Sequence, residues 1–422
     1  MIKKVKSDFL KHTITLLSGN IVSQAIAFAI YPLLARMYSA VDFGTLAIFT
    51  SIFSLLRIAS TGRYDFAIVM SESEQESNAL FRLSIGINLL FSLGVLLIIV
   101  IGKIYFPLFS YFQKLGWFVY LVPLMVFLTG FCLSACYYLN KQKQYKTMAK
   151  ADITINSSVS IFKLGFGVVK FTHIGLIVAS IIGQFAGVVY YFSKVGKKPF
   201  KERKNTYPSV AKKYKNFPLY VMPKEFLHTL SMRLPFLILV FYFETELLGF
   251  LSMAITLSLT PIGLFAGGLT KVLYQQIAEN VQKKTTIILF FKNYTKKIFF
   301  AALPVFIILY FFAEPVFSFV LSKEWGQSAT YFRFILPWMF IYLIASPFDF
   351  IPNLFSEQKK AVIFDFIYML LCFIGLEIGI LENSFSLAVI LFGTAGIINF
   401  LFLFFWYFHL IKQYEMKHTN LQ

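Results

Sequence analysis

Long apolar segments recur along the whole chain and are separated by short polar segments. A helix needs about 20 apolar residues to cross about 30 Å of hydrocarbon, and the pattern predicts about twelve such helices. We expect them near 13–35, 43–61, 79–101, 116–138, 152–170, 174–193, 221–243, 247–270, 295–320, 329–350, 361–381 and 385–411. The sequence therefore predicts an all-α polytopic membrane protein.

One polar stretch is longer than the others and divides these spans into two sets of six. It reads KVGKKPFKERKNTYPSVAKKYKNFPLYVMPK and begins at Lys194. We expect an N-terminal six-helix bundle over residues 1–193, a cytoplasmic basic linker over 194–220 and a C-terminal six-helix bundle over 221–422.

The two predicted bundles share a weak sequence repeat. Pro32 corresponds to Pro235, and Gly44 corresponds to Gly249, with a difference of two residues in spacing. An even number of spans in each half predicts a parallel repeat, related by an axis along the membrane normal. Chance similarity between apolar segments is the alternative explanation. The repeat predicts two pseudo-symmetric bundles around a central cavity.

The charge distribution gives the orientation and excludes other classes of protein. The 422 residues are 58% hydrophobic and only 14% charged, which is far less charge than a soluble protein of this size carries. The net charge of +19 comes from Lys and Arg in the segments between spans, and most of the 39 fall on one side of the membrane. The positive-inside rule places both termini in the cytoplasm, and nucleic-acid binding is not needed to explain the basic residues.

Four cations fall within predicted spans. Lys163 and Arg233 lie nearest the middle of a span, whereas Arg57 and Arg333 lie nearer the ends. A charge inside a span costs about 2.5–3.5 kcal/mol on insertion, so these side chains are expected to face a water-filled cavity or the bundle interior. A cavity lined by them suits an anionic cargo such as a pyrophosphate or an acidic sugar. The alternatives are structural ion pairs and snorkelling side chains.

Polar residues at helical spacing support a central cleft. Asn20 and Gln24 lie on one face of the first span, and similar stripes occur in the second, fifth and eighth spans. We expect Asn20 and Gln24 to line the cleft together with the four cations. Interhelical packing by polar residues is the alternative.

The sequence carries no motif for catalysis. The three Cys have neither metal nor disulfide-framework spacing, the five His form no metal-binding pair, and no Walker A motif is present. The predicted outer loops are too short to hold a catalytic domain. We therefore expect no enzyme activity, no catalytic residue, no metal and no cofactor.

Segments along nearly the whole chain resemble the Wzx-type polysaccharide flippases. GNIVSQAIAFAIYPLLARMYSAVDFGTLAIFTSIFSLL is similar to the opening of these proteins, and GRYDFAIVMSESEQESNALFRLS is similar to the loop after their second span. LNKQKQYKTMAKADI resembles the loop after their fourth span, and EWGQSATYFRFILPWMFIYLIASP resembles the entry to their tenth. These flippases belong to the multidrug/oligosaccharidyl-lipid/polysaccharide exporter superfamily. Arg63, Tyr64 and Asp65 match a recurrent loop element of the family.

The resemblance implies a V-shaped pair of six-helix bundles in a bacterial inner membrane. The implied cargo is an undecaprenyl-pyrophosphate-linked oligosaccharide, moved from the cytoplasmic to the periplasmic leaflet by alternating access. The products would be O-antigen, capsule or exopolysaccharide. Antiport of H⁺ or Na⁺, contact with membrane lipids and cooperation with polysaccharide assembly proteins are further implications.

Three other functions fit part of the pattern. A multidrug or organic-cation antiporter of the same superfamily should carry acidic residues in its cavity, and the excess of cations within the spans disfavours it. A polysaccharide polymerase or ligase has a similar number of spans but carries a large outer loop, which is absent from this pattern. A lipid II flippase of the same superfamily usually has two more spans.

Overall fold

The structure, a computed structural model, describes residues 24–26, 28–105, 116–201, 207–283, 286–355 and 357–419. These residues form helices and connecting turns, and none of them is in a β-strand. The helices form two compact units, Met1–Gly249 and Phe250–Gln422. The all-α class predicted from the sequence is confirmed.

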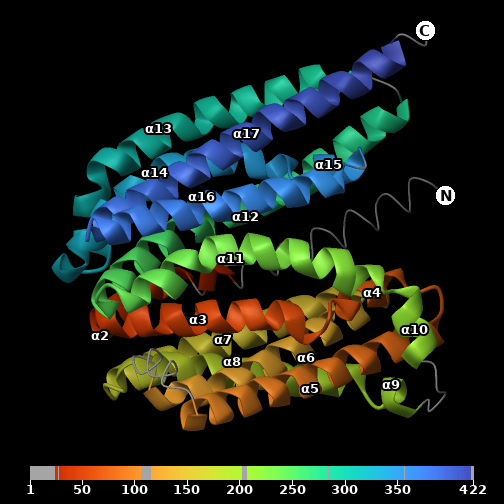
Figure 1. The fold of residues 1–422 in the computed structure, drawn as a ribbon, viewed down its shortest axis with the longest axis horizontal. Coiled ribbons are helices and arrows are strands. Elements are labelled where there is room, and N and C mark those ends of the chain that lie inside the picture. Colours follow the sequence, from red (N-terminus) through yellow and green to blue (C-terminus); the bar gives the residue numbers. More distant parts are fainter. Residues whose placement is uncertain are drawn as a thin grey trace. The chain divides into compact units, whose positions relative to one another are not determined.

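The first unit is built from five long helices that lie side by side (Figure 1). They are α3 (Ala40–Ser60), α5 (Glu74–Tyr105), α6 (Leu121–Lys141), α7 (Tyr145–Val168) and α8 (Thr172–Val195). The shorter elements are α2 (Tyr31–Met37), α4 (Tyr64–Met70), α9 (Lys198–Lys201), α10 (Tyr207–Lys213), a π-helical turn at Phe217–Val221, α11 (Met222–Ile238) and a 3₁₀ turn at Leu239–Phe241. Among these, α11 packs against α3.

The second unit contains most of α12 (Thr245–Lys283) and the helices that follow it. These are α13 (Ile288–Val320), α14 (Gly326–Ala345), α15 (Ile351–Leu354), α16 (Gln358–Leu381) and α17 (Phe385–Thr419), with 3₁₀ turns at Lys323–Trp325 and Ser346–Phe348. The helix α17 packs against α14 and α16, and α13 packs against α14. An aromatic core forms where Phe291 of α13 lies 4.4 Å from Phe348 and 5.3 Å from Phe404 between ring centroids.

Nine helices within the described residues are long and apolar enough to cross a membrane. They coincide with nine of the spans predicted from the sequence, which makes the chain a multi-pass membrane protein. The first predicted span lies largely outside the described residues. The fifth and seventh correspond to α7 and α11, which carry Lys163 and Arg233 and are not among the nine. The total of twelve therefore stays a prediction.

The domain boundaries predicted from the sequence also stay a prediction. The compact units follow spatial contacts, and α11 belongs to the first unit because it packs against α3. Part of the predicted linker, 194–220, forms α9 and α10, and both of these short helices pack against α5. The basic linker is thus attached to the first unit along part of its length.

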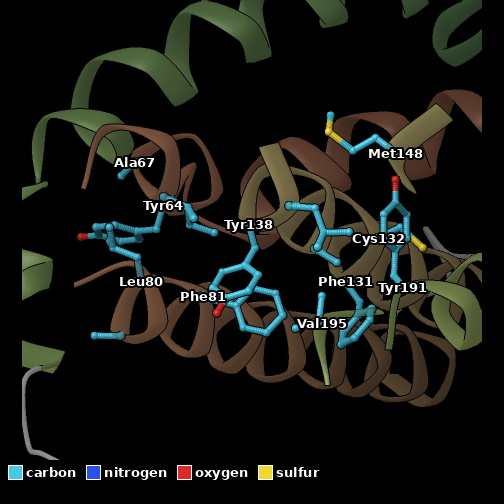
Figure 2. Close-up of a cluster of buried hydrophobic side chains, with 14 of the residues drawn as sticks. Tyr64, Ala67, Leu80, Phe81, Phe131, Cys132, Tyr138, Met148, Tyr191 and Val195 are labelled. Atoms are coloured by element: carbon cyan, nitrogen blue, oxygen red, sulfur yellow. The ribbon is translucent and has the colours of Figure 1, made fainter. Parts of the chain in front are cut away.

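Buried hydrophobic side chains, among them Phe81 and Tyr138, form a core of the first unit (Figure 2). Buried hydrogen bonds add to this packing. The rings of Phe81 and Tyr138 lie 5.0 Å apart between centroids, and the Tyr138 hydroxyl donates to Oδ1 of Asn78 at 2.7 Å. The hydroxyls of Ser84 and Ser134 share a hydrogen bond of 2.6 Å between α5 and α6. Interhelical hydrogen bonds of this kind stabilise membrane helices by about 0.6 kcal/mol each, and they fix α5 against α6.

The repeat-related glycines make equivalent contacts with each other's helix. A Cβ added to Gly44 on α3 would overlap the main-chain oxygen of Thr245, and a Cβ added to Gly249 on α12 would overlap the main-chain oxygen of Ala40. Each glycine faces the carbonyl four residues before its counterpart. Only glycine permits so close an approach of two helix backbones.

Candidate functional site

Two cations from predicted spans lie on neighbouring helices of the first unit. Arg57 is near the end of α3, Arg233 is in the second half of α11, and both side chains are half-buried. Their positive charges repel each other. Among the residues that the structure describes, no carboxylate lies within 4 Å of either guanidinium. Two such charges held close together can bind an anion.

A third arginine, Arg63, lies in the turn between α3 and α4. Its backbone is left-handed, with φ of 57°, and the preceding Gly62 has φ of 56°. The Arg63 side chain is buried and forms an ion pair with Glu225 in the first turn of α11. Its guanidinium carbon also lies 4.9 Å from the centre of the Phe66 ring. These contacts hold a backbone conformation that non-glycine residues seldom adopt.

Asp65 is a buried carboxylate close to the arginines. Its Oδ2 lies 3.8 Å from a terminal nitrogen of Arg63, and its Oδ1 accepts a hydrogen bond of 2.8 Å from the Thr61 hydroxyl. Asp65 also attracts the Arg57 guanidinium. Burial raises the pKa of Asp65, and the Thr61 hydrogen bond and the Arg63 charge oppose this shift only in part.

We refer to Arg57, Arg63 and Arg233 as the arginine cluster. Within it, Arg63 pairs with Asp65 and Glu225. Asp65 also attracts Arg57, and the charge of Arg57 acts on Arg233. Arg63 is the member already engaged by both carboxylates, so Arg57 and Arg233 retain the excess positive charge. The cluster is therefore suited to an anion with several oxygen acceptors.

The other predicted site residues lie elsewhere. Lys163 is on α7, where its main-chain oxygen accepts a hydrogen bond of 2.7 Å from the Tyr38 hydroxyl. Gln24 is in a short described helical segment before α2, and Asn20 lies outside the described residues. The structure therefore places two of the predicted residues, Arg57 and Arg233, on packed helices, where their like charges act on each other.

Arg333, on α14 of the second unit, already has local partners. Its Nε donates to the main-chain oxygen of Tyr310 at 3.1 Å, and a terminal nitrogen lies 3.7 Å from the Glu314 carboxylate. Both partners are on α13, so the contact joins two helices of this unit. A local ion pair was the alternative considered for this residue.

The loop element at residues 63–65 contacts the segments around α11, which the sequence pattern did not predict. Besides the Arg63–Glu225 pair, the Tyr64 hydroxyl donates to the main-chain oxygen of Ala211 at 3.2 Å. Lys213 of α10 forms ion pairs with Glu76 at 2.7 Å and Glu72 at 3.0 Å. The segment that leads into α11 is thereby held by the turn after α3 and by the residues around the start of α5. The resemblance singled out residues 63–65, but no sequence pattern indicated their partners.

Comparison with known proteins identifies the family and the fold. Residues 33–374 match the polysaccharide biosynthesis protein family, which is most of the chain. No curated protein matches the chain.

Solved structures of several transporters share the fold at low sequence identity. One is an inward-facing multidrug resistance MATE family transporter of the MOP superfamily, with 13% identity, a TM-score of 0.71, and coverage of 96% of this chain and 99% of that one. Another is the lipid II flippase MurJ in an inward closed conformation, with 16% identity, a TM-score of 0.69, and coverage of 97% and 91%.

A third is a MOP superfamily transporter from Pyrococcus furiosus with a reversed polarity of its binding pocket. Its identity is 14% and its TM-score 0.61, and the alignment covers 96% of each chain. At these identities the structural similarity establishes the fold, and the family match is independent of it. The chain is a multi-pass membrane protein that shares its fold with these solved structures, and it belongs to the polysaccharide biosynthesis protein family.

Proposed function

We propose that this protein is a flippase for undecaprenyl-pyrophosphate-linked oligosaccharide repeat units. It moves them from the cytoplasmic to the periplasmic leaflet of a bacterial inner membrane by alternating access, for O-antigen, capsule or exopolysaccharide assembly. The family match supports a role in polysaccharide biosynthesis, and the shared transporter fold supports transport rather than catalysis.

The arginine cluster is the observation that carries this proposal. Arg57 and Arg233 hold positive charge on packed helices, with no carboxylate in ion-pair distance among the described residues. A pyrophosphate offers several anionic oxygens, which planar guanidinium groups bind in a bidentate manner. We assign Arg57 and Arg233 as the principal ligands of the pyrophosphate, and Arg63 as the residue that positions α11 beside them.

The remaining predicted site residues are assigned weaker contributions to cargo binding than Arg57 and Arg233. Lys163, Gln24 and Asn20 are assigned to contacts with the sugar or with the outer part of the anion. Arg333 ranks last because Glu314 and Tyr310 already engage its guanidinium. Ion coupling to H⁺ or Na⁺ and cooperation with assembly proteins belong to the proposal through the family resemblance.

The charge of the cluster also separates this function from the alternatives. A multidrug antiporter for organic cations needs carboxylates that face its cargo, whereas here the excess charge is positive. A polymerase or ligase requires a catalytic group in reach of the sugar. Arg57 and Arg233 are cations, so they supply neither the carboxylates that an organic-cation antiporter needs nor a catalytic group for a polymerase.

The test is complementation of a strain that lacks the chromosomal copy. Arg57→Gln and Arg233→Gln should each reduce surface polysaccharide about tenfold or more, because a charge-assisted contact contributes about 1.5–3 kcal/mol. Lipid-linked repeat units should accumulate on the cytoplasmic side of the membrane. Lys163→Gln should give a smaller loss. Membrane abundance of every variant is compared by immunoblot.

Arginine-to-lysine variants separate the effect of losing the charge from an effect on folding. Arg57→Lys and Arg233→Lys should restore part of the output, since they keep the charge but lose the bidentate geometry. Normal polysaccharide in Arg57→Gln and Arg233→Gln would overturn the assignment.

A further inference from the structure

The second unit contains a cavity that the proposed transport function does not use. It has a volume of about 420 Å³ and lies between α13 and α17. Phenylalanine rings form most of its wall, and Lys292, Thr295 and Lys296 complete it. The aromatic lining residues are Phe291, Phe299, Phe300, Phe404, Phe405 and Phe408.

The helix α13 is exposed along most of its length. Its most apolar stretch is only 6% buried, although the helix has 33 residues. In a membrane protein such a surface contacts lipid, and an apolar cavity beside it is filled by hydrocarbon rather than by water. The Phe side of the cavity therefore suits an acyl chain.

Two lysines give one end of the cavity a positive charge. Lys292 and Lys296 are one helical turn apart on α13, and both are exposed. The Lys292 ammonium lies 5.4 Å from the centre of the Phe408 ring. Within the part of the chain that the structure describes, neither lysine forms an ion pair with a carboxylate.

Near this end of the cavity, one carboxylate is engaged by main-chain nitrogens and one buried hydroxyl is available as a donor. Glu415 of α17 accepts hydrogen bonds from the main-chain nitrogens of Ile287 and Ile288, at 2.8 Å for Ile288, so its charge is used to cap the start of α13. The Thr295 hydroxyl is buried and has no hydrogen-bond partner among the described residues. A phosphodiester oxygen placed between Lys292 and Lys296 would find two cations and a donor on one wall.

We propose that this cavity is a binding site for an anionic phospholipid of the phosphatidylglycerol type. Its phosphodiester would lie at Lys292 and Lys296, and one acyl chain would lie along the phenylalanines. The orientation predicted by the positive-inside rule places the two lysines at the cytoplasmic leaflet, where basic pockets between helices bind anionic headgroups. The proposal does not depend on the identity of the transported cargo.

The experiment measures lipid-dependent stability of the purified full-length protein in a neutral detergent. Dioleoyl phosphatidylglycerol should raise the Tm of the wild type more than dioleoyl phosphatidylcholine does, because a ligand stabilises the state that it binds. Lys292→Gln together with Lys296→Gln should abolish this difference. The matched control, Lys359→Gln together with Lys360→Gln, removes the same charge from the second unit and should retain it.

A second variant separates binding from folding. Thr295→Val removes the unpartnered hydroxyl at nearly constant shape, so its Tm in phosphatidylcholine should equal or exceed that of the wild type. Its response to phosphatidylglycerol should be smaller. An equal response of the wild type to both lipids, or a full response in the Lys292/Lys296 double variant, would overturn the proposal.

Native mass spectrometry distinguishes a resident lipid from the cargo. Phosphatidylglycerol should remain bound when undecaprenyl phosphate is added, and the double variant at Lys292 and Lys296 should lose the bound phosphatidylglycerol. Displacement of phosphatidylglycerol by undecaprenyl phosphate would instead assign the cavity to the cargo and refute the resident-lipid assignment. If the protein does not transport lipid-linked oligosaccharides, the wild type should still retain phosphatidylglycerol and the double variant should still lose it.

Discussion

Arg63 and Glu225 form an ion pair that joins the turn after α3 to the first turn of α11. The Arg63 side chain is 4% exposed and that of Glu225 is 33% exposed, so the two ends of the pair differ in their access to water. This pair holds α11, and with it Arg233, beside the helix that carries Arg57.

Removing the buried partner, Arg63, should lower the free energy of unfolding more than removing the partly exposed partner, Glu225. Arg63→Gln leaves the buried Asp65 carboxylate without its cation, and we expect a loss of about 3 kcal/mol in the free energy of unfolding. Glu225→Gln should cost only about 1 kcal/mol, because Glu225 is partly solvated. Urea unfolding of the purified protein in detergent measures both values. Equal losses in the two variants would contradict the difference inferred from burial.

The stability of the first unit should depend on the protonation of Asp65. Burial raises the pKa of this carboxyl, so the folded chain keeps the proton to a higher pH than the unfolded chain does. The resulting stabilisation is fully present below the ordinary pKa of about 4 and is lost as the pH rises through the raised value. Asp65→Asn is neutral at every pH and should not show this loss.

The pH prediction is read from the difference in Tm between wild type and Asp65→Asn. The Tm of Asp65→Asn should increase relative to the Tm of the wild type as the pH rises from about 4 to about 7. A difference that shrinks over this range would mean that the Arg63 charge, and not burial, controls Asp65.

Contact between the repeat-related glycines should not tolerate a methyl group. A Cβ at Gly249 would overlap the Ala40 carbonyl, so Gly249→Ala should destabilise the protein by about 1–3 kcal/mol. Gly44→Ala should have a similar effect through Thr245. The matched control is Gly86→Ala on α5, where no atom lies within 4 Å of the added Cβ, and it should stabilise the helix by about 0.5–1 kcal/mol. Thermal unfolding of the three variants tests the comparison.

Arg333 should behave as a structural cation. Arg333→Gln removes an ion pair whose two side chains are 30% and 64% exposed, and such pairs contribute about 0–1 kcal/mol. Surface polysaccharide in the complementation assay should stay near the wild-type level. A loss as large as that of Arg233→Gln would place Arg333 among the cargo ligands.

Much of the fold could be predicted because long apolar segments have few alternatives in a bilayer. Nine predicted spans coincide with long apolar helices among the described residues. The helices α7 and α11 are not among the nine; each carries a cation, Lys163 or Arg233, and α11 has only 17 residues. The same charges that obscured these two spans marked them as candidates for function.

The candidate site could be predicted only in part. Arg57 and Arg233 are candidates because of their position within apolar segments, which is a local property of the sequence, and their role stays a prediction. The Arg63–Glu225 pair depends on the packing of α11 against α3, and the Arg333–Glu314 pair depends on the packing of α13 against α14. Neither spacing corresponds to one face of one helix, so helical periodicity could not reveal these partners.

The reciprocal contact of Gly44 and Gly249 has a consequence for how single substitutions act on it. Each glycine meets the carbonyl four residues before the other, which is the arrangement found where two identical subunits meet across a two-fold axis. Because both glycines belong to one chain, each can be substituted alone. One side of the contact can therefore change while the other is retained, which a contact between two identical subunits does not allow.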